Sequence, residues 1–123
     1  MLKTIIFGLI VSFVCFGTSI STAKAPDRTL REYSPQELVS YFAKQYSVSE
    51  HQMLVTMACE SGFRTNAIGD SGKSFGLSQI HLPSNPQVTQ EEALDKVYAV
   101  EFMAREFKQG HQRKWTCWRN NFL

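Results

Sequence analysis

The chain has 123 residues, of which 43% are hydrophobic and 20% are charged, and its formal net charge is +2. This composition is typical of one compact globular domain and excludes a disordered, fibrous or multidomain chain. Because the positive excess is so small, it gives no general signal for a protein that binds polyanions such as nucleic acids.

The first 25 residues have the pattern of an export signal. Lys3 supplies a short positive start, residues 5–16 are nearly all apolar, and small or polar residues follow from Gly17. The apolar run is shorter than the roughly 20 residues of a membrane-spanning helix, so we expect cleavage between residues 21 and 25 rather than a stable membrane anchor. The mature domain, residues 26–123, would then be periplasmic or secreted.

Cysteine usage fits an exported protein. Cys15 lies in the predicted signal, which leaves Cys59 and Cys117 as a pair in a compartment where thiols oxidise. We therefore predict a disulfide between Cys59 and Cys117. In the chain-entropy model, a crosslink that closes a loop of this length stabilises a protein by roughly 4 kcal/mol, a large share of the stability of a small domain.

Three stretches have the Ser/Thr-x-x-Glu pattern, in which a hydroxyl and a carboxylate satisfy free amides at the start of a helix. They are Ser34–Glu37, Ser47–Glu50 and Thr89–Glu92. After the first, Pro35 and an apolar stripe predict a helix over about 35–45. After the second, apolar residues at helical spacing and a final Gly62 predict a helix that carries Cys59 and Glu60.

The segment after this second helix is rich in turn-forming residues. Residues 62–75 contain many Gly, Ser, Asn and Asp and show little apolar periodicity, so we expect a loop or at most a short hairpin around residues 64–76. Residues 76–81 fit one helical turn. Pro83 and Pro86 then interrupt regular structure until the third capping pattern.

A further apolar stripe predicts the longest helix, from about residue 95 to residue 108. Trp115 and Trp118 stand on either side of Cys117, so we expect aromatic surface and the crosslink to tie the end of the chain to the core. No longer run of alternating apolar and polar residues predicts a strand. The predicted fold class is therefore mainly α, with at most a short hairpin or loop after the second helix.

A spaced signature begins at the end of the second helix. It consists of Glu-Ser-Gly-Phe at 60–63, Asn-Ala at 66–67, Gly72, and Gly-Leu-Ser-Gln-Ile at 76–80. This resembles the E-S-x-F...A...G...G-L-x-Q-I signature of the lytic transglycosylases of SLT type, whose domains have a small lysozyme-like fold. The resemblance extends to most of the mature chain, because a helix like residues 95–109 and a Trp-rich end also suit that family.

The resemblance implies a lyase that cleaves the β-1,4 bond between N-acetylmuramic acid and N-acetylglucosamine in peptidoglycan, without a cofactor. Glu60 matches the family's single catalytic acid and base, and the muramyl 6-hydroxyl attacks to give a 1,6-anhydro product. The chemistry agrees with this assignment. A glycosidic oxygen leaves poorly unless it is protonated, and a carboxyl can protonate it near neutral pH only in a partly desolvated site.

Four further residues are candidates for binding substrate or orienting the acid. Ser61, Ser78 and Gln79 offer hydroxyl or amide groups for the acid or for the acetamido group of a sugar, and among them we favour Gln79. Many members of the family have a tyrosine near the acid where this chain has Phe102. Tyr98, one helical turn earlier, is the candidate replacement.

Three functions stay open on the sequence alone: a lytic transglycosylase, a hydrolytic lysozyme, and a peptidoglycan-binding or assembly module without activity. A hydrolytic lysozyme would use a second carboxylate to activate water, and Asp70 is a candidate for it. An aspartate after Gly69 is more simply explained as a turn residue. A glutamate at a helix end is by itself usually just solvated, so the role of Glu60 depends on the signature around it. The process served, such as wall growth, a secretion or conjugation apparatus, or attack on other cells, is equally open.

Glycan strands of peptidoglycan are the partner that these residues predict, and a secretion or conjugation apparatus stays open as a further one. His51, His81 and His111 lack the spacing of metal ligands, so we expect no metal site. Basic residues gather between Lys108 and Arg119, which is typical of a solvated surface, and we expect no nucleic-acid partner.

Overall fold

The computed structural model describes residues 28–123, and the predicted export signal, residues 1–25, lies outside the described residues. The described part of the chain is mainly helical with one small three-stranded sheet, which confirms the predicted fold class. Within it, no helix combines the length and the apolar character needed to cross a membrane. The predicted Cys59–Cys117 disulfide is also confirmed.

Helix α1, Pro35–Tyr46, begins as its sequence predicts. The Ser34 side chain accepts a hydrogen bond from the Glu37 amide, the Glu37 carboxylate accepts one from the Ser34 amide, and Pro35 occupies the first turn. The apolar stripe of this helix faces α4. Its buried residues are Leu38, Val39, Phe42 and Ala43.

Helix α2, Glu50–Ser61, starts differently from the prediction. Ser49, not Ser47, is its N-cap and accepts a hydrogen bond from the amide of Gln52. Ser47 instead ends α1 in a left-handed conformation with φ 54°, and its N–H bonds back to that helix. An N-cap residue needs an extended backbone, so Ser47 cannot serve both helices.

Three two-residue strands follow α2 in the antiparallel order β1, β2, β3. They are Ile68–Gly69, Ser74–Phe75 and Ile80–His81. The hairpin predicted around residues 64–76 is therefore present. The helical turn predicted for residues 76–81 is wrong, because this segment turns tightly and returns to pair with β2.

Gly76 makes that return possible. Its φ is +77°, and a Cβ built on it would lie 1.9 Å from the carbonyl oxygen of Ala93 in α3, Gln90–Leu94. Only glycine fits both the backbone angle and this close approach. The glycine of the signature is thus explained by packing of the sheet against α3.

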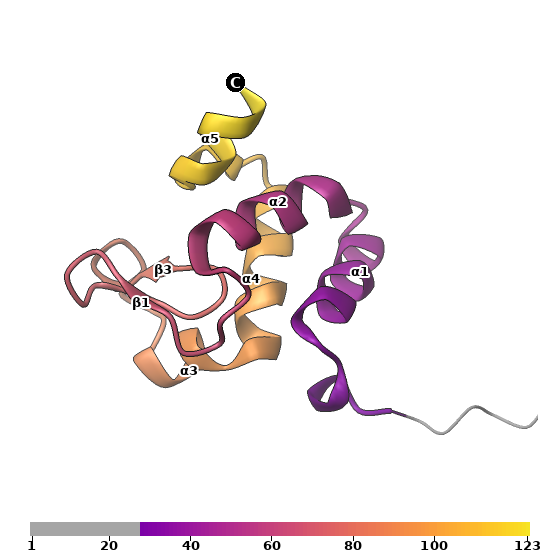
Figure 1. The fold of residues 1–123 in the computed structure, drawn as a ribbon, viewed down its shortest axis with the longest axis horizontal. Coiled ribbons are helices and arrows are strands. Elements are labelled where there is room, and N and C mark those ends of the chain that lie inside the picture. The colour runs from indigo at the N-terminus through magenta and orange to yellow at the C-terminus, as the bar shows by residue number, and fades with distance from the viewer. Residues whose placement is uncertain (1–27) are drawn as a thin grey trace, which may run out of the picture.

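Helix α4, Lys96–Lys108, is the longest of the described helices and matches the predicted range. In Figure 1 it runs through the middle of the molecule, with α1 on one side, the strands and α3 on the other, and α2 crossing it. Helix α5, Thr116–Phe122, packs on α2 and was not predicted. The remaining short 3-10 helices are η1 Leu30–Glu32, η2 Leu82–Ser84 and η3 Gln112–Lys114.

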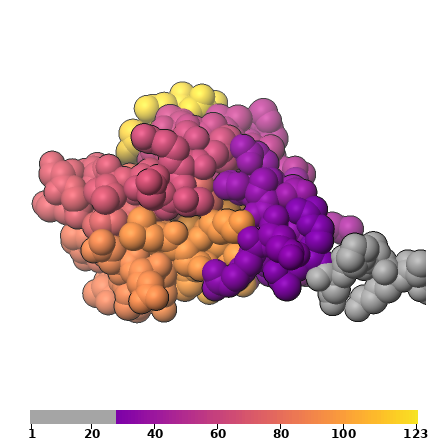
Figure 2. Space-filling view, turned by 60° about the horizontal axis from the view of Figure 1, so that its bottom comes forward, coloured from indigo at the N-terminus to yellow at the C-terminus, as the bar shows by residue number. Residues whose placement is uncertain are grey.

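The core lies where α1, α2, α4 and the sheet meet. Several large side chains there have no solvent exposure at all, among them Met53, Met57, Leu77, Val100 and Met103. In the space-filling view, the sheet segment together with α3 and α4 forms one side of the molecule and α1 forms the other (Figure 2). The end of α2 lies beside the sheet (Figure 1), and Ala58 and Cys59 there are exposed.

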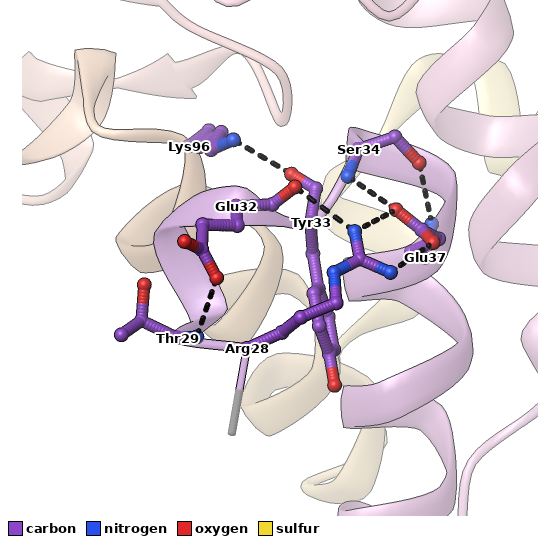
Figure 3. Close-up of polar contacts among 7 residues, drawn as sticks. All are labelled: Arg28, Thr29, Glu32, Tyr33, Ser34, Glu37 and Lys96. Carbon is purple, nitrogen blue, oxygen red and sulfur yellow. Dashed lines mark hydrogen bonds and ion pairs between the residues drawn. The ribbon is translucent and has the colours of Figure 1, made fainter. Parts of the chain in front are cut away.

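A polar network fixes the first described residues onto α1 and α4 (Figure 3). The Arg28 guanidinium donates to both carboxylate oxygens of Glu37, at 3.1 and 3.3 Å, and lies 4.7 Å from the ring centroid of Tyr33. The Lys96 ammonium donates to the Tyr33 carbonyl at 2.6 Å. Hydrogen bonds from Arg28 and the Ser34 amide hold the pKa of Glu37 at about 2.

Candidate active site

A cleft with a volume of about 670 Å³ opens at the C-terminal end of α2. It lies between the sheet, α4 and the start of α5, so segments far apart in the sequence form its walls. The lining residues that matter below are Glu60, Asp70, Gln79, Phe102, Trp115 and Thr116. A cleft of this size accommodates a small organic ligand or a few sugar units.

Glu60 is in the last turn of α2 and is half-buried. Gly62 ends the helix in a left-handed conformation, which turns the chain away and leaves the carboxyl at the edge of the cleft. Its Oε1 accepts a hydrogen bond from the backbone N–H of Cys117 at 3.2 Å. The acid is therefore held by α5, the element that the sequence did not predict.

The surroundings of Glu60 favour its protonated form. Burial is the largest cause, and it raises the pKa of the carboxyl above its ordinary value. The negative charge of Asp70 also raises this pKa, whereas the hydrogen bond from Cys117 and the positive charge of Arg119 lower it. The net shift is upward. A carboxyl in this state can donate a proton at a higher pH than an exposed glutamate can.

Gln79 lines the same cleft, so the structure brings it together with Glu60. Its amide nitrogen donates to the carbonyls of Ala67, at 3.2 Å, and Gly76, at 2.9 Å. A Cβ built on Gly69 would lie 2.3 Å from its Oε1. The side chain thus braces the hairpin from within, and it forms part of the cleft wall.

Ser61 and Ser78 do not line the cleft. Both are almost fully buried, and their hydroxyls donate to backbone carbonyls: Ser61 to Met57 at 3.1 Å, and Ser78 to Ala99 at 2.6 Å. The Ser78 carbonyl in turn accepts a 2.7 Å hydrogen bond from the indole of Trp115. The Ser61 hydroxyl thus bonds within α2, and Ser78 ties the turn between β2 and β3 to α4 and to Trp115, so neither hydroxyl is open to a ligand.

Tyr98 is not brought to the cleft either. Its ring stacks on Phe102 at 6.4 Å between centroids, and it lines a separate hollow that includes Arg31 and Asp95. Phe102 is the residue of this pair that lines the cleft. Its ring, and that of Trp115, give the cleft an apolar wall without a tyrosine hydroxyl from position 98.

Asp70 has two roles at once. It sits in the β1–β2 turn with φ 51°, and its Oδ2 accepts a hydrogen bond from the Ser74 hydroxyl, as expected of a turn aspartate. It also lines the cleft, and its negative charge raises the pKa of Glu60. The cleft therefore contains a second carboxylate in addition to Glu60.

The wall from the end of the chain is the part that sequence reasoning missed. Lys114, Trp115 and Thr116 line the cleft, and the Cys59–Cys117 disulfide, with a Cα–Cα distance of 5.9 Å, joins this segment to α2. The signal that could have located it was present: a cysteine next to Glu60, paired with a cysteine between two tryptophans.

Comparisons of the chain with known protein families, with curated proteins and with solved structures find no match. Within residues 28–123, no group of three or more His, Cys, Asp and Glu side chains is placed to hold a metal ion. The titratable side chains that line the cleft are Glu60, Asp70, Lys73, His81 and Lys114, and two of them are carboxyl groups. One is half-buried and biased towards its acid form, beside aromatic rings and the amide of Gln79.

Proposed function

We propose that this protein is a peptidoglycan lytic transglycosylase that acts in the cell wall space, with Glu60 as general acid and base. The observation that carries the proposal is a half-buried glutamate with a raised pKa at the edge of a cleft large enough for sugars. It is the same glutamate that the signature of residues 60–80 marks as the acid. Export of the mature domain would bring it to its substrate.

The reaction needs one carboxyl in two successive states. Protonated Glu60 gives its proton to the glycosidic oxygen, and the N-acetylglucosamine unit leaves as an alcohol. The carboxylate then takes the proton from the 6-hydroxyl of the muramyl unit, whose oxygen bonds to the anomeric carbon and closes the 1,6-anhydro ring. Glu60 ends as it began, protonated, and neither water nor a second carboxylate is consumed.

The cleft walls suit this cycle. Phe102 and Trp115, which are 4% and 6% exposed, place aromatic surface at the cleft and help to keep water from the acid. Polar side chains of Ser71, Asn85 and Thr116 line it as well. The Asn85 amide nitrogen already donates to the His81 carbonyl and the Thr116 hydroxyl accepts from Arg119, which leaves the Asn85 amide oxygen and the two hydroxyl hydrogens for a sugar. The lining is mostly polar, with apolar surface from Ile80, Phe102 and Trp115, and this mixture suits a sugar, which has many hydroxyl groups and apolar ring faces.

Hydrolysis is the second candidate, and the position of Asp70 favours it. A carboxylate in the cleft beside the acid is the arrangement with which glycosidases activate water or stabilise the oxocarbenium ion. The two candidates differ in product. The transglycosylase releases 1,6-anhydromuramyl ends, whereas a lysozyme releases reducing ends, and mass spectrometry of the soluble muropeptides distinguishes them.

The test of the proposal is turnover of purified sacculi by the wild type and by Glu60→Gln. We expect the substitution to reduce turnover by about 10²–10⁴-fold, the usual contribution of a general acid and base. Glu50→Gln is the matched control, because Glu50 is an exposed glutamate in the first turn of the same helix. Equal turnover by Glu60→Gln and wild type would refute the proposal, and binding of sacculi without turnover by the wild type would favour a wall-binding module.

Glu60→Gln should not lose activity through unfolding. Because burial raises the pKa of Glu60, the folded state disfavours its carboxylate, so this residue costs stability at pH values above its pKa. We therefore expect the melting temperature of Glu60→Gln at pH 7 to equal or exceed that of the wild type. A circular dichroism melt beside each activity assay checks this.

A further inference from the structure

Two adjacent residues of α2, Cys59 and Glu60, are both bonded to Cys117 in α5. Cys59 forms the disulfide with Cys117, and the next residue, Glu60, accepts a hydrogen bond at Oε1 from the backbone N–H of the same Cys117. A covalent bond and a hydrogen bond therefore converge on one residue of α5. Any crosslink would stabilise the fold, but this one also places a hydrogen-bond donor at the carboxyl of Glu60.

We propose that the Cys59–Cys117 disulfide is a positioning device for Glu60, which holds the Cys117 N–H against Oε1 and so fixes the rotation of the carboxyl group in the cleft. This inference rests on the proposed function of Glu60. In residues 28–123, no hydrogen bond to Oε2 accompanies the one to Oε1. Oε2 is therefore the oxygen left to exchange a proton with substrate.

The need for such a device follows from where the two partners lie. Glu60 is in the last turn of its helix, and helix ends fray. Cys117 is in a seven-residue helix close to the end of the sequence, and a helix of that length has little stability of its own. A hydrogen bond between two such ends persists only if something else keeps them together.

Other contacts hold α5 without fixing this pair. The indole of Trp118 donates to the side chain of Gln52 at 2.9 Å, and the ring centroid of Phe122 lies 6.0 Å from that of His51. Gln52 and His51 are near the start of α2, far along the helix from Glu60. Trp115 is anchored in the core by its hydrogen bond to the Ser78 carbonyl. Without the disulfide, α5 should therefore stay on α2, while residue 117 becomes free to move relative to Glu60.

A direct test uses the amide of residue 117 as the reporter, and it needs no enzymatic activity. In ¹⁵N-labelled wild type, we expect this amide resonance to shift with pH as Glu60 titrates, because its proton is bonded to that carboxylate. Glu60→Gln should abolish the shift, which identifies its source. In Cys59→Ser/Cys117→Ser we expect the shift to be lost, and an undiminished shift in this folded variant would overturn the proposal.

Measurements of kcat distinguish a role of the disulfide in positioning Glu60 from a role in stabilising the fold. Cys59→Ser/Cys117→Ser should lower kcat by on the order of 10–100-fold with little change in KM, because a small misplacement of a reacting group costs rate while the cleft walls remain. Val39→Ala is the control, since Val39 is fully buried in α1 and does not line the cleft. It should lower the melting temperature and leave kcat unchanged. An unchanged kcat in the folded double variant would contradict the proposal.

Trp118→Ala keeps the proposal testable if the double variant does not fold. This change removes the hydrogen bond to Gln52 but leaves the disulfide in place. We expect the resonance of residue 117 still to follow the titration of Glu60. Loss of that dependence with the disulfide intact would show that the disulfide does not position the acid. Because the resonance is measured without substrate, its outcome is independent of whether the wild type cleaves sacculi.

Discussion

Two glutamates of this protein show how surroundings set the behaviour of one side chain. Glu37 is exposed and pairs with Arg28, and its pKa falls to about 2. Glu60 is half-buried beside Asp70, and its pKa is raised. The first environment keeps a carboxylate charged to stabilise a helix start, whereas the second favours a carboxylic acid that can protonate another group.

Replacing Asp70 by Asn should change the pH dependence of turnover. Loss of the negative charge lowers the pKa of Glu60, so its acid form is lost at a lower pH. The alkaline limb of the pH–rate profile of Asp70→Asn should therefore move to lower pH, while the amide oxygen can still accept the hydrogen bond from Ser74. Steady-state rates on sacculi between pH 4 and pH 9 measure this, at roughly one-unit steps.

The same variant also separates the two candidate reactions. If Asp70 acted as a second catalytic carboxylate, Asp70→Asn would abolish turnover across the whole pH range rather than displace one limb. That outcome would favour the lysozyme over the transglycosylase.

Arg28→Ala should destabilise the fold only while Glu37 is charged. The pKa of Glu37 is about 2 in the folded protein against an ordinary value of 4.5, so the stability that this pair contributes is fully present above pH 4.5 and is lost as the pH falls through 2. The difference in melting temperature between wild type and Arg28→Ala should therefore narrow over this range. Salt should narrow it as well, since both side chains are exposed. A difference that is constant from pH 7 to pH 2 would contradict this.

At the scale of elements, the sequence predicts what is long or capped and misses what is short. The helices near residues 35–45 and 95–108 are confirmed because each presents an apolar stripe over several turns. The strand Ile80–His81 was missed, because two residues cannot show an alternating pattern. Helix α5 was missed because it is seven residues long and has no side-chain cap.

Gly76→Ala should be strongly destabilising, because the sheet and α3 meet at this residue. A left-handed backbone and a Cβ placed 1.9 Å from the Ala93 carbonyl oxygen together cost roughly 2–6 kcal/mol. Gly110→Ala is the matched control, since Gly110 has a similar φ, +80°, with nothing within 4 Å of its Cβ position. Thermal melts should show a much larger fall in melting temperature for Gly76→Ala than for Gly110→Ala. Equal falls would mean that the close contact with α3 does not determine the cost of the substitution at Gly76.

For the whole molecule, the candidate site is assembled from segments that only the fold brings together. Glu60 and Gln79 could be singled out from the sequence because both belong to one spaced signature within residues 60–80, and the structure places both at the cleft. Ser61 and Ser78 belong to the same signature, but both are buried and their hydroxyls donate to backbone carbonyls inside the fold. The wall from Trp115 and Thr116 was missed because no local pattern marks it, and only the long-range link of the Cys59–Cys117 disulfide pointed to its position beside Glu60.

The measurement that tests the account most directly is the release of soluble muropeptides from purified sacculi by wild type and Glu60→Gln at equal concentration near neutral pH. We expect the wild type to release anhydromuramyl products and the variant to release at least about 100-fold less, with both proteins folded. Comparable release by the two proteins would contradict it.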